Sequence, residues 1–179
     1  MAENEKPDVV DKMVDAYERM LARTEEMIQH AEKETVPAFR EMLAKARDNM
    51  VELGELTREE AAKVADYVER DVKDAANYIA ETGDDLRNWW RFDLRLIEQR
   101  MLETFSAVAD QTSVQLRGWA EQARQASLYR TGEIAGPGAL TCTACGAEMH
   151  MHSTGRIPPC PKCHATSFKR AAEPEGSTS

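Results

Sequence analysis

The four cysteines of this chain all lie within the 22 residues from Cys142 to Cys163, as two C-x-x-C pairs with fourteen residues between them. Two residues between ligands allow a tight turn, called a knuckle, to bring both sulfurs of a pair to one ion. Gly146 follows the first pair, where a positive φ closes the knuckle. Between the pairs, Glu148–His152 alternates as a strand. The pattern predicts a β zinc ribbon with one structural Zn²⁺ bound by four sulfurs: Cys142, Cys145, Cys160 and Cys163.

Four protein ligands fill a tetrahedral zinc site and leave no open position for a reacting water, which favours a structural metal over a catalytic one. We therefore expect a protein without enzymatic activity. Iron is the alternative metal, because rubredoxins hold iron with similar knuckles. A redox or electron-transfer protein that uses the four cysteines is a further alternative, since a C-x-x-C pair can cycle between dithiol and disulfide.

Three histidines close to the cysteines are auxiliary site candidates. His150 and His152 are two residues apart, so they face the same side of the expected strand and could bind a second metal or a phosphate. Solvent exposure is the simpler interpretation of this pair. His164 follows the second cysteine pair directly, where glycine is commoner, and could shield a sulfur or act as an alternate ligand.

The charge of the chain is uneven. Residues 1–127 hold 18 Lys and Arg against 28 Asp and Glu, a formal charge of −10, whereas residues 128–179 carry +1. An acidic surface repels a phosphate backbone, so nucleic-acid binding is expected only through the ribbon. Four basic residues there could form a small patch: Arg156, Lys162, Lys169 and Arg170.

The sequence also bears on the compartment. No apolar run approaches the roughly eighteen residues of a membrane span, and the N-terminus, MAENEKPDVV, is acidic rather than like a secretory signal. We therefore expect a cytoplasmic protein with no membrane partner. Thiols in the cytoplasm are kept reduced, and paired cysteines there are more often metal ligands than disulfides.

Apolar residues recur at steps of three and four from Val10 to Ala126, the period of amphipathic helices. A capping box, in which the side chains of Thr57 and Glu60 each bond the other's backbone, predicts the start of the third helix. Proline and glycine predict where the first three helices end: at Pro37, Gly54 and Gly83.

The fourth apolar stripe runs without a break over residues 85–127, which predicts a rod about 60 Å long. Such a rod is stable only when other helices cover its stripe, and short links favour antiparallel hairpins. We therefore expect a mainly α fold: a long antiparallel helical bundle, coiled-coil-like, followed by the small C-terminal β zinc ribbon. The expected division is a disordered N-terminus, the bundle, the ribbon and a disordered tail: residues 1–7, 8–127, 128–170 and 171–179.

Two further stretches make the sequence similar to a known bacterial family. The segment Leu53–Thr57 (LGELT) opens a helix, and Tyr129–Ile134 (YRTGEI) leads into the cysteine pairs. Together with the cysteines, these segments resemble the YbeL-like zinc-ribbon proteins over about residues 15–170. The resemblance implies the fold and the four metal positions. No activity is assigned to that family, so the resemblance implies none.

These observations favour a non-enzymatic zinc-binding protein that serves as a protein-interaction or regulatory module, with the ribbon on a helical stalk. The expected partner is another protein, and the narrow stripe of the first helix also permits a homo-oligomer. Nucleic-acid binding through the ribbon is an alternative. A further alternative rests on layout alone: helical hairpins joined to zinc modules resemble regulators of bacterial RNA polymerase, with Asp84 and Asp85 at an acidic hairpin tip.

Overall fold

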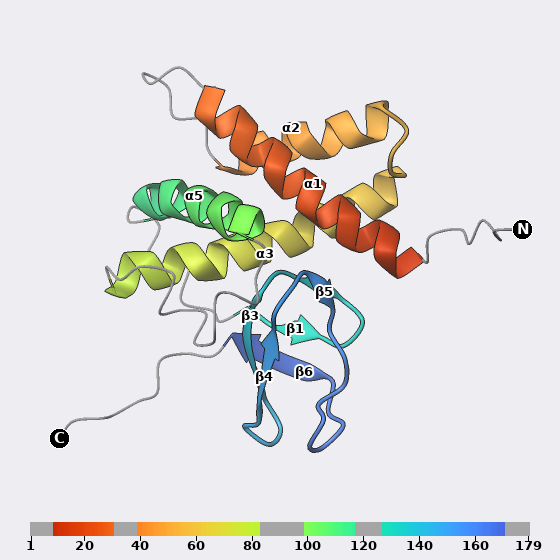
Figure 1. Ribbon diagram of the computed structural model, residues 1–179, viewed down its shortest axis with the longest axis vertical. Coiled ribbons are helices and arrows are strands. Elements are labelled where there is room, and N and C mark those ends of the chain that lie inside the picture. The colour runs from red at the N-terminus through yellow and green to blue at the C-terminus, as the bar shows by residue number, and fades with distance from the viewer. Residues whose placement is uncertain (1–8, 31–38, 83–98, 117–126, 171–179) are drawn as a thin grey trace, which may run out of the picture.

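The computed structural model describes residues 9–30, 39–82, 99–116 and 127–170. Within these ranges, helices come first and short strands follow (Figure 1). A helical region with a C-terminal antiparallel β region, as predicted, is confirmed. No helix in this part of the chain is long and apolar enough to cross a bilayer. The helices are α1 (Val9–His30), α2 (Phe39–Glu52), α3 (Arg58–Thr82) and α5 (Gln99–Leu116).

Helix α1 uses the apolar stripe that its sequence predicts. Tyr17 and Met20 are fully buried in the helical core. Thr24, the polar member of the stripe, is also fully buried, and its hydroxyl donates to the Met20 carbonyl at 2.8 Å. Thr24 therefore does not interrupt the stripe, because its hydroxyl is satisfied within the helix.

The link between α2 and α3 follows the predicted stop and start signals. Gly54 has a φ of +70°, as a left-handed helix stop requires. At the start of α3, the Thr57 amide donates to the Glu60 carboxylate at 2.9 Å, and the Glu60 amide donates to the Thr57 hydroxyl at 3.2 Å. The capping box is confirmed.

Helix α3 lies at the centre of the helical part. It packs against the other three described helices and also against the ribbon. Its apolar pattern predicts six inner positions, and five of them are fully buried: Ala61, Val64, Val68, Val72 and Ala75. The side chain of the sixth, Ile79, lies outside the described part of the structure. Because this face carries only small and β-branched side chains, neighbouring helices can approach it closely.

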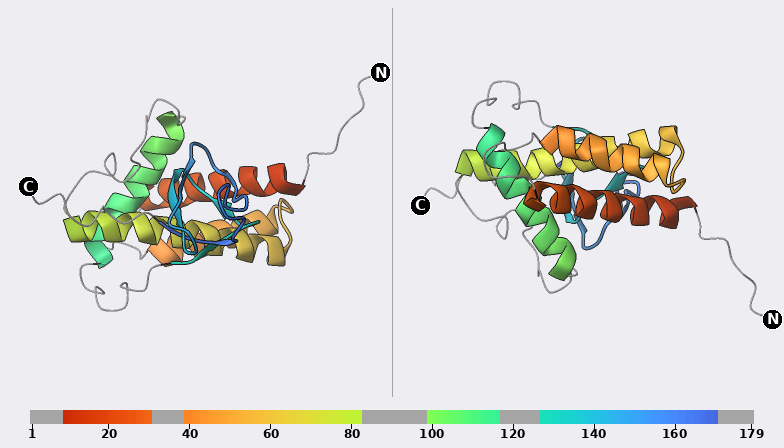
Figure 2. Two further views of the ribbon diagram at one scale, coloured as in Figure 1. Left: turned by 90° about the horizontal axis from the view of Figure 1, so that it is seen from below. Right: turned by 90° about the horizontal axis from the view of Figure 1, so that it is seen from above.

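The predicted forty-residue fourth helix is described only over α5, which has 18 residues. The remainder, with Trp89, Trp90 and the acidic pair Asp84 and Asp85, lies outside the described residues. Figure 2 shows α5 crossing α1 and α3 at a wide angle instead of running alongside them. A long coiled-coil bundle is therefore not seen in the part of the chain that the structure describes.

The ribbon consists of two small sheets. A four-stranded antiparallel sheet has the order β1-β6-β3-β4, and β2 pairs with β5. Phe168 on β6 lies opposite both Tyr129 and Cys142, so β6 occupies the middle of the larger sheet. The strands are β1 (Tyr129–Arg130), β2 (Ile134–Ala135), β3 (Gly138–Cys142), β4 (Glu148–Met151), β5 (Gly155–Arg156) and β6 (Ser167–Arg170).

The ribbon lies against the sides of α1 and α3 (Figure 1), and does not project beyond the end of the helices. Strand β2 touches both helices, and its Ile134 belongs to the helical core. The ribbon keeps a second core of its own, centred on Tyr129, Leu140 and Phe168. The ribbon therefore packs on the side of the helices through Ile134 and also has a separate core of its own.

Candidate metal centre

The first cysteine pair forms a knuckle at the end of β3. The Gly146 amide donates to the Cys142 carbonyl at 3.0 Å, and the Cys142 amide donates to the Ala147 carbonyl at 2.9 Å. Gly146 has the predicted positive φ, +71°. The turn therefore closes as the sequence indicates, with both sulfurs on the same side of it.

The second pair repeats this arrangement residue for residue. The His164 amide donates to the Cys160 carbonyl at 2.9 Å, and the Cys160 amide donates to the Ala165 carbonyl at 2.9 Å. His164 has a φ of +60°, and no other non-glycine residue among those described has a positive φ. His164 therefore closes the second knuckle in the left-handed backbone conformation that glycine adopts more easily.

The two knuckles bring the four predicted cysteine sulfurs together, all within 4.8 Å of one another. The sulfurs of Cys142 and Cys163 are 3.6 Å apart, and those of Cys145 and Cys160 are 3.7 Å apart. A tetrahedron of zinc–sulfur bonds of about 2.3 Å has edges of about 3.8 Å, whereas a disulfide needs about 2.05 Å. The donor set therefore fits a tetrahedral zinc ion and excludes a disulfide in this geometry.

Backbone amides prepare the cluster to hold charged sulfur. The amides of Cys163 and Lys162 donate to the Cys160 sulfur and lower the pKa of this thiol to about 6. The Ala165 amide acts to lower the pKa of Cys163, but the neighbouring sulfurs, Cys145 first, outweigh it and raise that pKa to about 12. Without a cation, a charged sulfur makes ionisation of the neighbouring thiols less favourable. A bound divalent cation offsets this repulsion and stabilises the thiolate forms.

The two histidines of β4 do not join this cluster. His150 and His152 are exposed, with ring centroids 6.2 Å apart in an edge-on arrangement. One ring nitrogen of His150 lies 2.7 Å from the Glu148 carboxylate. Within the described ranges, the four cysteines form the one group of three or more Cys, His, Asp or Glu side chains close enough to share an ion.

A buried polar network, which the sequence analysis did not predict, joins the ribbon to the helices. Its centre is Asp71 on α3, whose side chain is 0% exposed. The Asp71 carboxylate accepts from the Tyr17 hydroxyl of α1 at 2.7 Å and from the Gly136 amide of the ribbon at 2.6 Å. We call this set the docking network and define it as Tyr17, Arg70, Asp71, Asp74, Tyr129, Glu133 and Arg170.

The stretch YRTGEI, residues 129–134, supplies much of the ribbon side of the docking network. The Arg70 guanidinium on α3 pairs with the Glu133 carboxylate and donates to the Ile134 carbonyl at 2.8 Å. The Tyr129 hydroxyl donates to Asp74 at 2.6 Å, and the Tyr129 ring lies 3.9 Å below the Arg70 guanidinium. Three residues of this stretch, Tyr129, Glu133 and Ile134, therefore contact the helices.

Two glycines let the ribbon backbone approach this network. A side-chain carbon at Gly136 would lie 2.8 Å from the Tyr17 hydroxyl. At Gly138, which has a φ of +153°, it would lie 2.0 Å from the Arg170 guanidinium. The turn Gly136-Pro137-Gly138 is thus shaped by the side chains that it passes. This motif was the available signal for a close approach of backbone and side chains.

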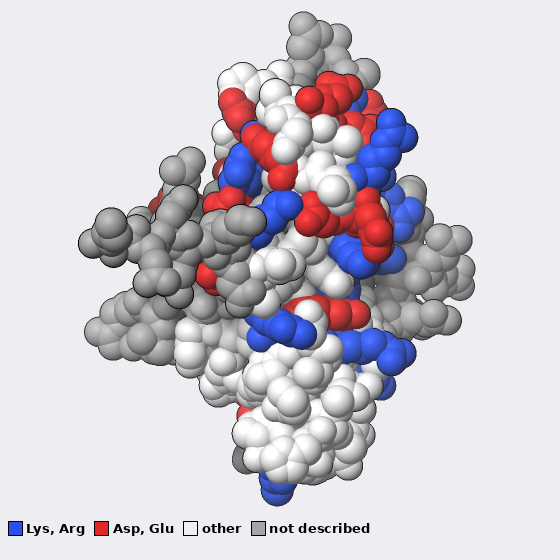
Figure 3. Space-filling model, turned by 90° about the vertical axis from the view of Figure 1, so that its right-hand side faces the viewer, with Lys and Arg blue, Asp and Glu red and all other residues white. Residues whose placement is uncertain are grey.

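The predicted basic patch is wrong in one of its members. The Arg170 side chain is only 6% exposed and belongs to the docking network, so it is not available on the surface. Lys162 and Lys169 are exposed, on the second knuckle and on β6. On the face shown in Figure 3, basic and acidic side chains alternate over the helical part, and the ribbon end is mostly uncharged.

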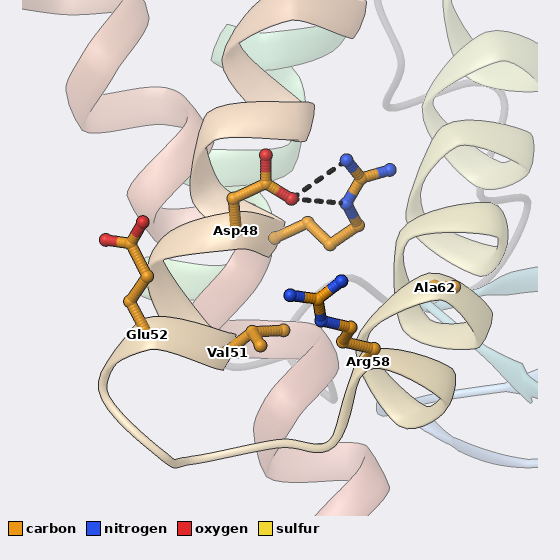
Figure 4. Close-up of a pocket in the computed structure, with 6 residues that line it drawn as sticks. Asp48, Val51, Glu52, Arg58 and Ala62 are labelled. Carbon is orange, nitrogen blue, oxygen red and sulfur yellow. Dashed lines mark hydrogen bonds and ion pairs between the residues drawn. The ribbon is translucent and has the colours of Figure 1, made fainter.

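A groove of about 430 Å³ lies between α2 and α3, next to the link that joins them. The Arg47 guanidinium donates to the Asp48 carboxylate there at 2.9 Å. Figure 4 shows Arg58 beside Val51 in the same groove. Two basic and two acidic side chains line the groove, so its formal charges cancel. The groove therefore shows no preference for a ligand of either charge. Its lining consists of Arg47, Asp48, Val51, Glu52, Arg58 and Ala62.

Comparison with known proteins agrees with this geometry. Residues 6–172 match the family described as "Zinc-ribbon containing domain". "Uncharacterized protein YbeL" of Escherichia coli strain K12 and its counterpart in Escherichia coli O157:H7 are each 23% identical to this chain over 161 residues, which cover 90% of this chain and 97% of the relative. No solved structure matches the chain. The predicted resemblance is confirmed, and the chain belongs to the YbeL-like family of zinc-ribbon proteins.

Proposed function

We propose that this protein is a non-enzymatic zinc-binding protein in which one structural Zn²⁺ is held by Cys142, Cys145, Cys160 and Cys163. The observation that carries the proposal is the closed set of four sulfurs, with separations of 3.6 and 3.7 Å, close to the edges of a zinc tetrathiolate. Because protein sulfur fills each position, the ion would hold the two knuckles together and would not activate water.

The metal also has an energetic reason to be structural. The ribbon core is small, with eight buried residues of which two are cysteines. A core of this size supplies too little hydrophobic stabilisation to fold alone, and metal binding typically supplies the remainder in such modules.

We further propose a role as a protein-interaction or regulatory module in the reducing cytoplasm, where such thiols stay available for metal. Two features support it. The described residues contain no group arranged around the cysteines as an acid, a base or an open metal position, and the ribbon is held firmly on a helical platform. A fixed combined surface of this kind suits recognition by another protein.

The test is the metal content and visible absorbance of the protein purified without added metal. The proposal expects one zinc per chain and no visible bands. Iron with visible bands would replace it by electron transfer. Full-length protein with four free or paired thiols and no metal would replace it by a thiol switch.

A further inference from the structure

Strand β6 connects the metal centre to the docking network. It starts four residues after Cys163 and pairs with β3, with Phe168 opposite Cys142. The Thr143 amide, inside the first knuckle, donates to the Ser167 carbonyl at 3.0 Å. The position of β6 is therefore set by both knuckles, and an ion that joins the knuckles also fixes this strand.

The far end of β6 carries Arg170 into the interface with the helices. Its guanidinium donates to the Tyr129 hydroxyl at 3.1 Å and to the Gly136 carbonyl at 3.3 Å, and it lies 3.5 Å from the Asp71 carboxylate. It also lies 4.9 Å from the centre of the Tyr129 ring. Arg170 is thus the cation that the ribbon contributes to a buried cluster on α3.

The charges of this cluster need both parts of the molecule. Asp71 is fully buried, and Asp74, also on α3, accepts from the Tyr129 and Ser127 hydroxyls. On the helices, the cation that pairs with Asp71 is Arg70, whose side chain is 12% exposed and also pairs with Glu133 of the ribbon. Without Arg170, the fully buried Asp71 would have to share Arg70 with Glu133. Leaving a buried charge unpaired is strongly unfavourable, so water would enter the interface.

We propose that Arg170 couples metal binding to the docking of the ribbon on α1 and α3. The coupling rests on the proposed structural zinc. With the ion bound, β6 is fixed, Arg170 pairs with Asp71, and the ribbon is held on the helices. Loss of the ion releases β6, withdraws Arg170 and exposes the face of α1 and α3 that carries Tyr17 and Asp71. Metal supply would thereby control which surface of the helical part a partner can reach.

Coupling of this kind is reciprocal, so the docking network must also affect the affinity for the metal. A substitution in the network, outside the knuckles, should weaken zinc binding. Arg170→Met removes the charge and keeps an apolar stem of similar length. Asp71→Asn removes the opposite charge from α3, in the part of the molecule that contains no ligand. Two matched controls replace exposed neighbours on the same elements: Lys169→Met on β6 and Asp66→Asn on α3.

The experiment measures the zinc affinity of the full chain by competition with a chromophoric chelator. We expect Arg170→Met and Asp71→Asn each to weaken zinc binding about tenfold, within the usual range for coupled sites, and the controls to stay within about twofold of wild type. Asp71→Asn provides the test on its own if Arg170→Met does not fold. Equal affinities in all five proteins would overturn the coupling and leave the zinc site standing, whereas wild type without zinc would overturn both.

Hydrogen exchange gives the reverse measurement on the wild-type chain. Removal of zinc by a chelator should speed amide exchange in the ribbon and also in the middle of α3, around Asp71 and Asp74, and leave α2 unchanged. Faster exchange confined to residues 127–170 would show that the helices do not sense the metal, and would overturn the proposal.

Discussion

At the scale of single residues, the metal centre depends on two backbone positions as much as on its four sulfurs. Gly146 and His164 close equivalent turns with φ values of +71° and +60°. Each donates its amide to the carbonyl of the first cysteine of its pair. A left-handed conformation costs a residue with a side chain about 1–2 kcal/mol and costs glycine little. The second knuckle therefore carries a strain that the first does not.

Exchanging the residue types at these positions should change stability in opposite directions. Gly146→Ala should destabilise by about 1 kcal/mol, for conformational reasons alone, because nothing lies within 4 Å of the added carbon. His164→Gly should stabilise by about 0.5 kcal/mol, since strain relief exceeds the added entropy of the unfolded chain. Urea unfolding at one fixed zinc concentration measures both. A destabilised His164→Gly variant would mean that the imidazole itself supports the site.

Gly138 tests the close packing of the docking network. Gly138→Ala should destabilise by roughly 3 kcal/mol, because the new carbon would meet the buried Arg170 guanidinium and the backbone has a positive φ. Gly155→Ala is the matched control, since its nearest neighbour would be 3.6 Å away. Similar unfolding midpoints for the two variants would show that Arg170 moves aside without cost, and would contradict the packing described above.

At the scale of elements, local signals predicted the helix boundaries well. The first helix was expected from Val10 and begins at Val9. The stop at Gly54 and the capping box at Thr57 and Glu60 both appear where the sequence places them. Such signals depend on a few neighbouring residues, so they can be recognised in the sequence without knowledge of the tertiary contacts. The knuckles were predictable for the same reason.

The capping box should account for a measurable part of the stability of α3. Thr57→Ala removes the hydroxyl that accepts from the Glu60 amide and should cost about 1 kcal/mol. Glu59→Gln, at an exposed position in the same helical turn, should stay within about 0.5 kcal/mol of wild type. Thermal unfolding followed by circular dichroism gives both values. Equal losses would point to first-turn charge, and not the cap, as the stabilising feature.

At the scale of the whole molecule, the sequence did not predict how the ribbon sits on the helices. Tyr17 was expected as a member of an apolar stripe, and it is, but its buried hydroxyl needed a partner that only the folded chain reveals. Arg170 was expected on a basic surface patch and is buried. Both depend on contacts between residues more than fifty positions apart in the sequence, from Tyr17 to Asp71 and from Arg170 to Asp71. Neither periodicity nor spacing encodes such contacts.

The partly buried acid Asp74 should make stability depend on pH in a predictable direction. Burial raises the pKa of Asp74, although the Tyr129 and Ser127 hydroxyls act to lower it. A group with a raised folded-state pKa contributes stability that is present below its unfolded pKa and is lost as the pH rises through the folded pKa. Asp74→Asn removes the charge and with it this loss; its amide oxygen can accept from the Tyr129 hydroxyl, and its NH2 group can donate to the Ser127 hydroxyl, which then acts as the acceptor.

Asp74→Asn should therefore be more stable than wild type at pH 7.5, by about 1 kcal/mol, and this advantage should shrink at pH 5. Urea unfolding of both proteins with excess zinc measures the difference between them, in which any common loss of metal cancels. A variant that is less stable at pH 7.5 would show that the Asp74 charge, held by the two arginines, stabilises the interface.

The central claim is that four sulfurs form one tetrahedral site, and cobalt tests it most directly. Co²⁺ should titrate the reduced, metal-free protein to an endpoint of one ion per chain, with the intense visible and sulfur-to-cobalt charge-transfer bands of a tetrahedral tetrathiolate, and Zn²⁺ should then remove these bands. Weak bands typical of octahedral cobalt, or an endpoint other than one ion per chain, would contradict the account.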